Sequence, residues 1–497
     1  MKTLLLAGSL MLNLLAAGSW AQDAGRGLLE LASAGETVAA RELLTRRTDV
    51  NASQTDGTTA LHWAVYYDDV DLVQSLLRRG ANATVKNDYG ASPLSQAAIT
   101  GNPDIIAALL KAGADANEAN ADGQTPLMVL ARTDNLPAAQ VLLDAGADVN
   151  VVEQWRGQTA LMWAAAQQQP AMVKLLLAHG ADPDAQSTPN DWERQVTAEP
   201  RIKVLPVGGL TPLLYAAREG CTLCVQYLIE GGADVDKTDP EGVTPLLMAT
   251  LNAHWDSAKL LLEGGANPNK WDWYGRNPLY AAVDYNTLPH GGRPDRLSAD
   301  LTTSMETIEL LLQAGANPNL QLKLFPPYRS LGADRGADGI LSIGTTPFLR
   351  AARAADLPAM TLLLEHGALP DLPTLTGVTP LMVAAGFRAS PIDTRGRFRT
   401  EEDAYETVKF ILEKTDVDIN ATEEGGQTAL HAAAFQGWNS VVTLLAQHGA
   451  DLQVQDSRGN TPIDAALGRA GGLARGQGVN VHTETAALLE SLSAEKR

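Results

Sequence analysis

Apolar, Ala-rich segments alternate with polar turns along this chain, and the alternation returns with a fixed period. Each unit opens on a hydroxyl or amide residue, then Pro or Ala, then an apolar residue. This opening begins at Thr59, Ser92, Thr125, Thr159, Thr211, Thr244, Asn277, Thr346, Thr379, Thr428 and Thr461. Successive openings lie 33, 33, 34, 52, 33, 33, 69, 33, 49 and 33 residues apart. A constant period predicts stacked supersecondary units, each of which contacts only its neighbours.

The unit from residue 243 to 269 shows why each period predicts a pair of helices. Thr244 is suited to cap a helix, and Pro245 fits the first helical position, where its missing N–H costs nothing. A second apolar segment contains 260–262, which gives broad cover for the next unit. Gly264 and Gly265 end that segment, because a helix C-terminus favours a left-handed residue.

The openings themselves carry a resemblance to a known family. They read TALH at Thr59 and Thr428, TPLM at Thr125 and Thr379, and TPLL at Thr211 and Thr244. With a period of 33, the chain resembles an exported bacterial ankyrin-repeat protein over nearly all of its mature length. The resemblance implies an all-α solenoid of paired helices with β-hairpin or loop fingers, in about eleven repeats plus an N-terminal cap.

The period also predicts the boundaries of the chain's parts. We expect a signal peptide at 1–21, an N-terminal capping repeat at 22–55, repeats 1–4 at 56–184, a finger insertion at 185–209, repeats 5–7 at 210–319 with an insertion near 284–304, a second finger insertion at 320–344, repeats 8–10 at 345–455 with an insertion near 388–403, and a C-terminal capping repeat at 456–497. The finger insertions end alike, in VLPVG and ILSIG. They are either a duplicated functional device or loops that the fold tolerates cheaply.

The N-terminus is typical of a secretory signal. Lys2 supplies a positive end, residues 4–17 an apolar stretch, and residues 19–21 a small-x-small cleavage site after Ala21. We expect export to a bacterial periplasm, with secretion as the alternative. No later segment is long and apolar enough to be a membrane span.

The formal net charge of −20 argues against nucleic acid or an anionic membrane as the partner, because both reward Lys and Arg. We therefore expect the partner to be another protein and the chain to be a monomer.

Most of the histidines recur at fixed positions of the repeat, which favours a structural role over a catalytic one. Six of the eight recur at fixed offsets within the unit: His62, His179, His254, His366, His431 and His448. His290 and His482 remain, and neither has ligands at metal-binding spacing. Phosphate-binding, nucleophile-elbow and dinucleotide motifs are not visible either. We predict no catalytic residue, no metal site and no cofactor.

Cys221 and Cys224 form the chain's single C-x-x-C motif, at the expected start of a second helix. In an oxidising compartment the spacing permits a structural disulfide. A pair of small core residues, or a redox enzyme or sensor with a lowered thiol pKa, is the alternative. Haem attachment is excluded because Val225 follows the motif.

Aromatic residues are the strongest indication of a binding site, because the resemblance implies that partners bind at finger tips and first-helix ends. Aromatic side chains commonly anchor protein interfaces. The predicted partner-binding residues are Tyr66, Tyr67, Tyr89, Trp155, Trp273, Tyr274, Tyr285, Phe325, Tyr328 and Phe435. We predict a non-catalytic interaction scaffold that holds a protein in its concave groove. The alternatives are packing between fingers, a thiol–disulfide redox protein, or a small-ligand binder built from the insertions.

Overall fold

A computed structural model describes residues 27–44, 47–189, 208–287, 300–324, 343–389, 400–469 and 481–495. These residues contain 24 α-helices, and their only β-pairings are the isolated bridges Ser53–Thr59 and Pro189–Gly208. The chain divides into two compact units, Met1–Ser187 and Thr188–Arg497. The described part therefore consists of helix pairs joined by turns.

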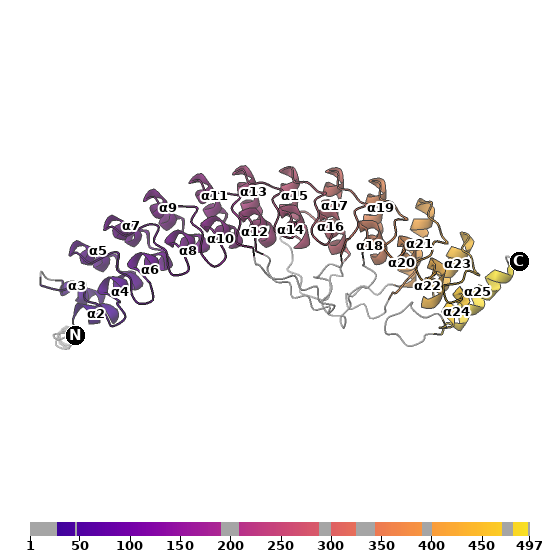
Figure 1. The fold of residues 1–497 in the computed structure, drawn as a ribbon, viewed down its shortest axis with the longest axis horizontal. Coiled ribbons are helices and arrows are strands. Elements are labelled where there is room, and N and C mark those ends of the chain that lie inside the picture. The colour runs from indigo at the N-terminus through magenta and orange to yellow at the C-terminus, as the bar shows by residue number, and fades with distance from the viewer. Residues whose placement is uncertain are drawn as a thin grey trace, which may run out of the picture. The chain divides into compact units, whose positions relative to one another are not determined.

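The first unit contains five helix pairs. The first helices of the pairs are α2 (Leu28–Ser33), α4 (Ala60–Tyr66), α6 (Pro93–Thr100), α8 (Pro126–Thr133) and α10 (Ala160–Ala166). The second helices are α3 (Thr37–Glu42), α5 (Val70–Arg78), α7 (Pro103–Lys111), α9 (Leu136–Asp144) and α11 (Pro170–Ala178). From α4 onward, first helices pack on first helices and second helices on second helices, so the pairs stand in two rows (Figure 1).

The second unit continues the same alternation with seven pairs. Its first helices are α12 (Pro212–Glu219), α14 (Pro245–Leu251), α16 (Pro278–Asn286), α18 (Pro347–Ala354), α20 (Pro380–Ala384), α22 (Ala429–Gln436) and α24 (Pro462–Ala466). Its second helices are α13 (Thr222–Glu230), α15 (Trp255–Glu263), α17 (Ser304–Gln313), α19 (Leu357–Glu365), α21 (Glu401–Lys414), α23 (Asn439–Gln447) and α25 (Thr483–Glu495).

Helix starts follow the capping chemistry that the sequence predicts. Thr244 Oγ1 accepts a hydrogen bond from Leu247 N at 3.1 Å, and Pro245 is the first residue of α14. Gly265, with a φ of 88°, ends the second helix of the same unit. An N-cap of this kind stabilises a helix by about 1 kcal/mol, and the same device recurs along the stack.

Buried apolar residues join adjacent first helices, as α14 and α16 show. Val243, Leu247 and Ala281 form one buried cluster, with Met248 and Leu251 packed against it. Small residues such as Ala249, which is fully buried, let adjacent first helices approach closely. Each repeat thus buries its apolar face against the neighbouring repeats, as the period predicts.

Three Asn-Ala-Ser/Thr triplets, at 51–53, 82–84 and 420–422, match a glycosylation acceptor, but their asparagines lie at contacts between consecutive repeats. Asn51 Nδ2 donates to Gly80 O at 3.1 Å, and Asn51 Oδ1 accepts from Asn82 N at 2.8 Å. Asn420 repeats the second contact, since its Oδ1 accepts from Asp451 N at 2.8 Å. Two of the three acceptor-like asparagines are therefore engaged in inter-repeat hydrogen bonds.

The all-α solenoid of about eleven repeats plus an N-terminal cap is confirmed: α2 and α3 form the cap, and eleven pairs follow. The predicted signal peptide and most of the two predicted finger insertions lie outside the described residues. Most of the segments predicted as insertions near 284–304 and 388–403 also lie outside them. Among the described helices, none has the length and apolarity needed to cross a membrane.

Candidate partner-binding surface

The finger turns between helix pairs are pinned by side chains of the turns themselves. In the first unit, Asn87 Oδ1 accepts from Tyr89 N at 3.1 Å and from Ala91 N at 2.9 Å. Neighbouring fingers are also joined, because Asp88 N donates to Asp56 O at 2.9 Å. The backbone of each tip is thus held on two sides, and a side chain at the tip is presented in a fixed place.

Two predicted binding residues stand at such tips in the first unit. Tyr89 is 80% exposed and Trp155 is 78% exposed. The buried carboxylate of Glu153 holds the second tip, accepting from Trp155 N at 2.8 Å and from Arg156 N at 2.7 Å. These rings are open to solvent on turns with little freedom to move.

The aromatic residues of 271–276, in the second unit, differ in whether a basic side chain lies over the ring. Trp273 is 54% exposed and its N donates to Glu241 O at 2.8 Å. Trp271 is covered by Lys323, whose Nζ lies 3.0 Å from the ring centroid. Tyr274 is half-buried beneath the Arg276 guanidinium, 5.1 Å from the ring. Trp273 is therefore the most exposed aromatic residue of this segment, although Trp271 is also 45% exposed.

A buried ion pair fixes this finger. Arg276 Nε donates to Asp272 Oδ2 at 2.6 Å, and both side chains are almost wholly buried. Asp272 Oδ1 also accepts from Tyr274 N at 3.0 Å and from Arg276 N at 2.8 Å. The carboxylate therefore closes the turn and neutralises the arginine that covers Tyr274.

The preceding finger, between α13 and α14, contains an acid with a strongly perturbed pKa. Burial, together with the nearby charges of Glu241 and Asp272, raises the pKa of Asp239 to about 6. Hydrogen bonds from Val243 N at 2.8 Å and Glu241 N at 2.9 Å oppose that rise. Asp239 serves the turn in the same way as Asp272, so its perturbed pKa reflects a structural role.

First-helix ends differ from one another more than the sequence suggests. Tyr66 and Tyr67 at the end of α4 are 56% and 42% exposed. Tyr285 is half-buried and packs edge-on against Trp255, with ring centroids 5.2 Å apart. Phe435, predicted as a contact residue, is only 9% exposed, because α22 is packed against α20, α23 and α24. We therefore leave Phe435 out of the candidate surface.

The remaining predicted contact residues, Phe325 and Tyr328, lie outside the described residues. The structure adds groups that the sequence analysis did not select. Lys323 covers Trp271, as described above, and Arg350 Nε donates to Asp284 Oδ1 at 2.6 Å between α18 and α16. Both members of that second pair are buried. The two residues of each pair are far apart in the sequence, so no local motif predicts either contact.

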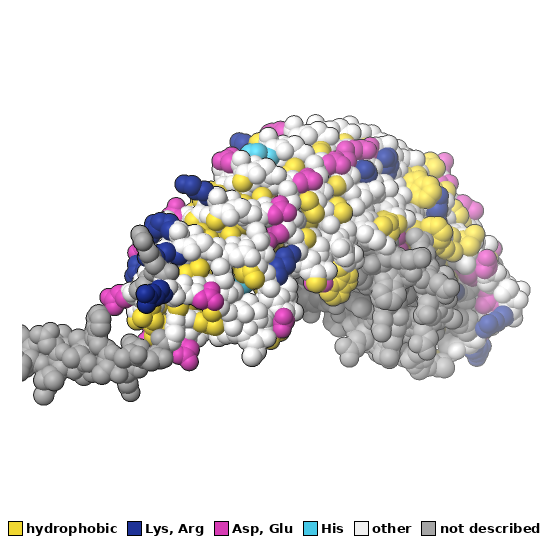
Figure 2. Space-filling model, turned by 60° about the vertical axis from the view of Figure 1, so that its left-hand side comes forward, with side chains coloured by type: hydrophobic (Ala, Val, Ile, Leu, Met, Phe, Trp, Pro, Cys, Tyr) yellow, Lys and Arg dark blue, Asp and Glu magenta, His cyan; other side chains and the backbone are white. Residues whose placement is uncertain are grey.

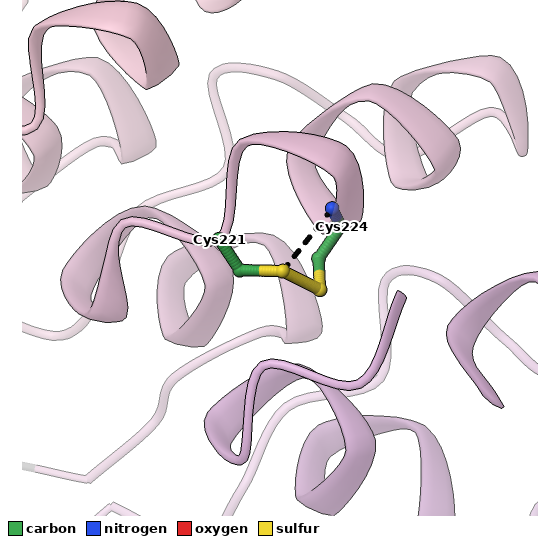
Figure 3. Close-up of a disulfide and its surroundings, with 2 residues drawn as sticks. All are labelled: Cys221 and Cys224. Carbon is green, nitrogen blue, oxygen red and sulfur yellow. Dashed lines mark hydrogen bonds between the residues drawn. A yellow bond between two sulfur atoms is a disulfide. The ribbon is translucent and has the colours of Figure 1, made fainter. Parts of the chain in front are cut away.

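The two cysteines form a disulfide at the start of α13 (Figure 3). Cys221 is the N-cap residue, and its Sγ accepts from Cys224 N at 3.3 Å. Cys221 is 7% exposed and Cys224 is fully buried. The pair thus closes the first turn of a helix whose counterparts in the first unit are capped by Asp69 and Asn102.

Histidines of the openings are engaged in repeat packing. His62 Nδ1 lies 2.9 Å from Thr59 Oγ1, and its Nε2 lies 3.0 Å from Ala91 O. His431 has the same two contacts with Thr428 and Asn460. Burial lowers the pKa of both imidazoles. Among the residues that the structure describes, no three His, Cys, Asp or Glu side chains gather as metal ligands.

Charge is spread out on the face shown in Figure 2. Apolar side chains lie there among acidic and basic ones, and neither sign of charge forms one continuous patch. Binding at this face would therefore depend on individual anchors and their immediate neighbours.

Comparison with known proteins gives one family. A family model described as ankyrin repeats, three copies, matches residues 28–120, 94–187, 213–322 and 400–474. Inversin of Danio rerio is 35% identical over 104 residues, which cover 21% of this chain and 9% of inversin. Ankyrin repeat domain-containing protein 63 of Homo sapiens is 33% identical over 122 residues, which cover 24% and 29% of the two chains. Ankyrin repeat and MYND domain-containing protein 1 of Homo sapiens is 28% identical over 169 residues, covering 27% and 18%. The matched region spans less than a third of each relative.

Proposed function

This chain belongs to the ankyrin-repeat family, and we propose that it is a non-catalytic scaffold that holds another protein through its finger tips and first-helix ends. Ankyrin repeats generally mediate protein–protein interaction. Family membership does not identify the partner, because one fold hosts many roles. The placement of the site is argued from this chain's own side chains.

The observation that carries the proposal is a set of exposed aromatic rings on pinned turns. Tyr89, Trp155 and Trp273 project from fingers whose backbones are fixed by buried or half-buried acid and amide side chains. Large rigid rings are the usual energetic anchors of interfaces. A tip that is already ordered loses little entropy on binding, which favours affinity.

A thiol–disulfide redox function is the second candidate, and only the Cys221–Cys224 pair supports it. Exchange requires an attacking thiolate to reach a disulfide sulfur. Both cysteines are almost wholly buried, and Cys221 caps α13. These features favour a structural disulfide in this repeat.

We also propose that the protein is exported from a bacterial cell and acts as a monomer in the periplasm. The apolar N-terminal segment and the disulfide both support an oxidising compartment outside the cytosol. Protein recovered from a bacterial periplasm should begin at Gln22 on N-terminal sequencing. Recovery of the intact N-terminus from the cytosol would contradict this part of the proposal.

Site-specific photo-crosslinking tests the binding surface. A photoreactive phenylalanine derivative replaces Trp155 or Trp273 in the exported chain, and Leu369 is replaced as the control. Leu369 is 49% exposed but follows the closing glycine of its unit, away from the finger tips. We expect the same discrete adduct from both tryptophan positions and none from Leu369. An adduct from Leu369 alone, or no adduct from either tryptophan position, would contradict the proposal.

A further inference from the structure

Three aromatic rings gather at the end of α4, and we call Trp63, Tyr66 and Tyr67 the α4 aromatic group. Tyr66 stands edge-on to both others, with ring centroids 5.7 Å from Trp63 and 5.1 Å from Tyr67. Trp63 and Tyr67 lie nearly parallel, with centroids 6.2 Å apart and planes at 28°. The hydroxyl of Tyr67 donates to Ser33 O at 3.1 Å. The group is thus ordered, and about half of each tyrosine faces solvent.

Elsewhere in the described chain, four aromatic rings on first helices and fingers lie beneath the chain's own cations. The pairs are Arg132 over Trp163 at 5.0 Å, Arg218 over Tyr215 at 5.0 Å, Arg276 over Tyr274 at 5.1 Å and Lys323 over Trp271 at 3.0 Å. A cation within about 6 Å of a ring centroid is attracted by the negative face of the ring. An intramolecular Arg or Lys thus satisfies the face of each of these four rings.

The α4 aromatic group lacks such a cation. Trp163 receives Arg132 from the last turn of the preceding first helix, α8. The first helix that precedes α4 is α2, which ends at Ser33 and has no basic residue in its last turn. Within residues 27–44 and 47–189, no Lys or Arg lies over any of the three rings. The exposed parts of Tyr66 and Tyr67, 56% and 42% of the two residues, therefore have no described cation beside them.

Acidic side chains lie beside Tyr67. Asp68 and Asp69, on the turn into α5, and Asp71, in its first turn, line a hollow together with Tyr67, Gly35 and Thr37. Only one of the three carboxylates has a described ion pair, Asp71 with Arg41 at 2.6 Å. Asp68 Oδ1 instead accepts from the neutral amide of Asn102 at 2.7 Å. The local charge is therefore negative, which complements a cation.

The neighbouring positions favour a polypeptide over a small ion. Ile99 occupies on α6 the place that Tyr66 has on α4, seven residues after the opening, and it is 66% exposed. The helices α4 and α6 pack side by side. Tyr89, at the finger between these two units, is also exposed. Apolar contacts thus flank the cation-accepting rings, as a peptide with a basic and an adjacent apolar side chain would require.

We propose that the α4 aromatic group, with Asp68 and Asp71 beside it, binds an arginine or lysine side chain of the partner polypeptide. This inference rests on the proposed function and names the chemistry of the partner. The cation lies over Tyr66 and Tyr67. It takes the role that an intramolecular Arg or Lys has over Trp163, Tyr215, Tyr274 and Trp271. The flanking apolar residue of the partner contacts Ile99.

The test uses the full mature chain and two blocked pentapeptides that differ only in the side chain of their central residue. One has a central arginine next to isoleucine, and the other has citrulline, a neutral arginine isostere, in the same place. Binding is followed by the ¹⁹F resonance of fluorotryptophan at Trp63, which contacts both tyrosines and is kept in every variant. We expect the arginine peptide to bind about twofold to fivefold more tightly, which is the range for a cation over exposed aromatic rings. High salt should reduce the preference.

Matched variants decide whether the rings are responsible. Tyr66→Leu/Tyr67→Leu keeps apolar surface and removes the ring faces, so it should abolish the preference for arginine. Tyr66→Phe/Tyr67→Phe keeps the rings and should retain it. Circular dichroism and melting show whether each variant folds. Equal binding of the two peptides, no binding at millimolar peptide, or a preference that survives in a folded leucine variant would overturn the inference.

The crosslinking experiment separates this inference from the proposed function. If the arginine preference is absent while Trp155 and Trp273 still crosslink to a partner, the inference fails and the scaffold function stands. If the preference is present while neither position crosslinks, the finger placement fails and the cation site stands.

Discussion

Two aromatic clusters of similar composition differ in what covers their rings. In the second unit, Lys323 lies over Trp271 and Arg276 lies over Tyr274, while Asp272 neutralises that arginine. In the first unit, the rings of the α4 aromatic group contact one another, and Tyr67 lies beside acidic side chains. The rings of the second unit are covered by cations of the chain itself. Tyr66 and Tyr67 of the first unit are about half exposed and have no described cation over them. The charge beside a ring therefore indicates its role better than the number of rings does.

The largest expected effect comes from breaking the buried pair of the finger. Asp272→Ala leaves the Arg276 guanidinium buried without its counter-ion, which typically costs about 3 kcal/mol or more. The turn also loses the acceptor for two backbone N–H groups. Urea denaturation should show this loss of stability, together with greater exposure of Tyr274.

The matched control is Asp71→Ala in the first unit. Asp71 also has an arginine partner at 2.6 Å, but its side chain is 76% exposed. An exposed pair contributes at most about 1 kcal/mol, so this variant should lose far less stability. Equal losses in the two variants would show that burial does not distinguish the pairs.

The next effect depends on pH. The pKa of Asp239 is raised to about 6 in the folded chain, above its ordinary value of 3.8. Its contribution to stability is therefore fully present below pH 3.8 and is lost as the pH rises through about 6. Asp239→Asn, which cannot ionise, should gain stability relative to the native protein between pH 5 and pH 7 (about one to three kcal/mol). A constant difference in unfolding free energy across that range would contradict the assignment.

The contribution of His62, in the first unit, to stability depends on pH in the opposite direction. Burial lowers its pKa below 6.5, so its contribution is present above that pH and is lost as the pH falls through the folded-state value. His62→Gln should therefore lose its disadvantage relative to the native protein as the pH falls from 7 to 5. Denaturation at several pH values measures both variants, and parallel pH profiles for Asp239→Asn and His62→Gln would refute the contrast.

The smallest effect comes from uncovering a single ring. Lys323→Gln removes the ammonium over Trp271, for a loss of about 0.5 to 1 kcal/mol. The ¹⁹F resonance of fluorotryptophan at Trp271 should move toward its solvent-exposed position. Lys86→Gln is the control, because Lys86 Nζ donates to Ala119 O at 3.2 Å. A Trp271 resonance unchanged by Lys323→Gln, or moved as far by Lys86→Gln, would argue against the covering.

The sequence predicts what is local and repeated. The openings place Thr244 as an N-cap and His62 in repeat packing, because both contacts lie within one unit and its neighbour. The C-x-x-C spacing permits the disulfide for the same reason. The solenoid follows from the period, since stacking repeats the same packing at each step.

The state of each aromatic residue could not be predicted, because it depends on contacts distant in sequence. Lys323 follows Trp271 by 52 residues, and Arg350 meets Asp284 across a helix pair. Phe435 occupies the place in its unit that Tyr66 has in another, yet only Phe435 is buried. A shared register gives the helix face, but the neighbours in the stack decide how much of that face is covered.

The central claim is that a partner protein covers the exposed rings of the fingers. Hydroxyl-radical footprinting of the mature chain, alone and in the complex recovered by crosslinking, tests it most directly. The account predicts protection of Tyr89, Trp155 and Trp273, with Trp255, which is already buried, unchanged. Protection confined to second helices, with the three finger rings oxidised at the same rate in both states, would contradict it.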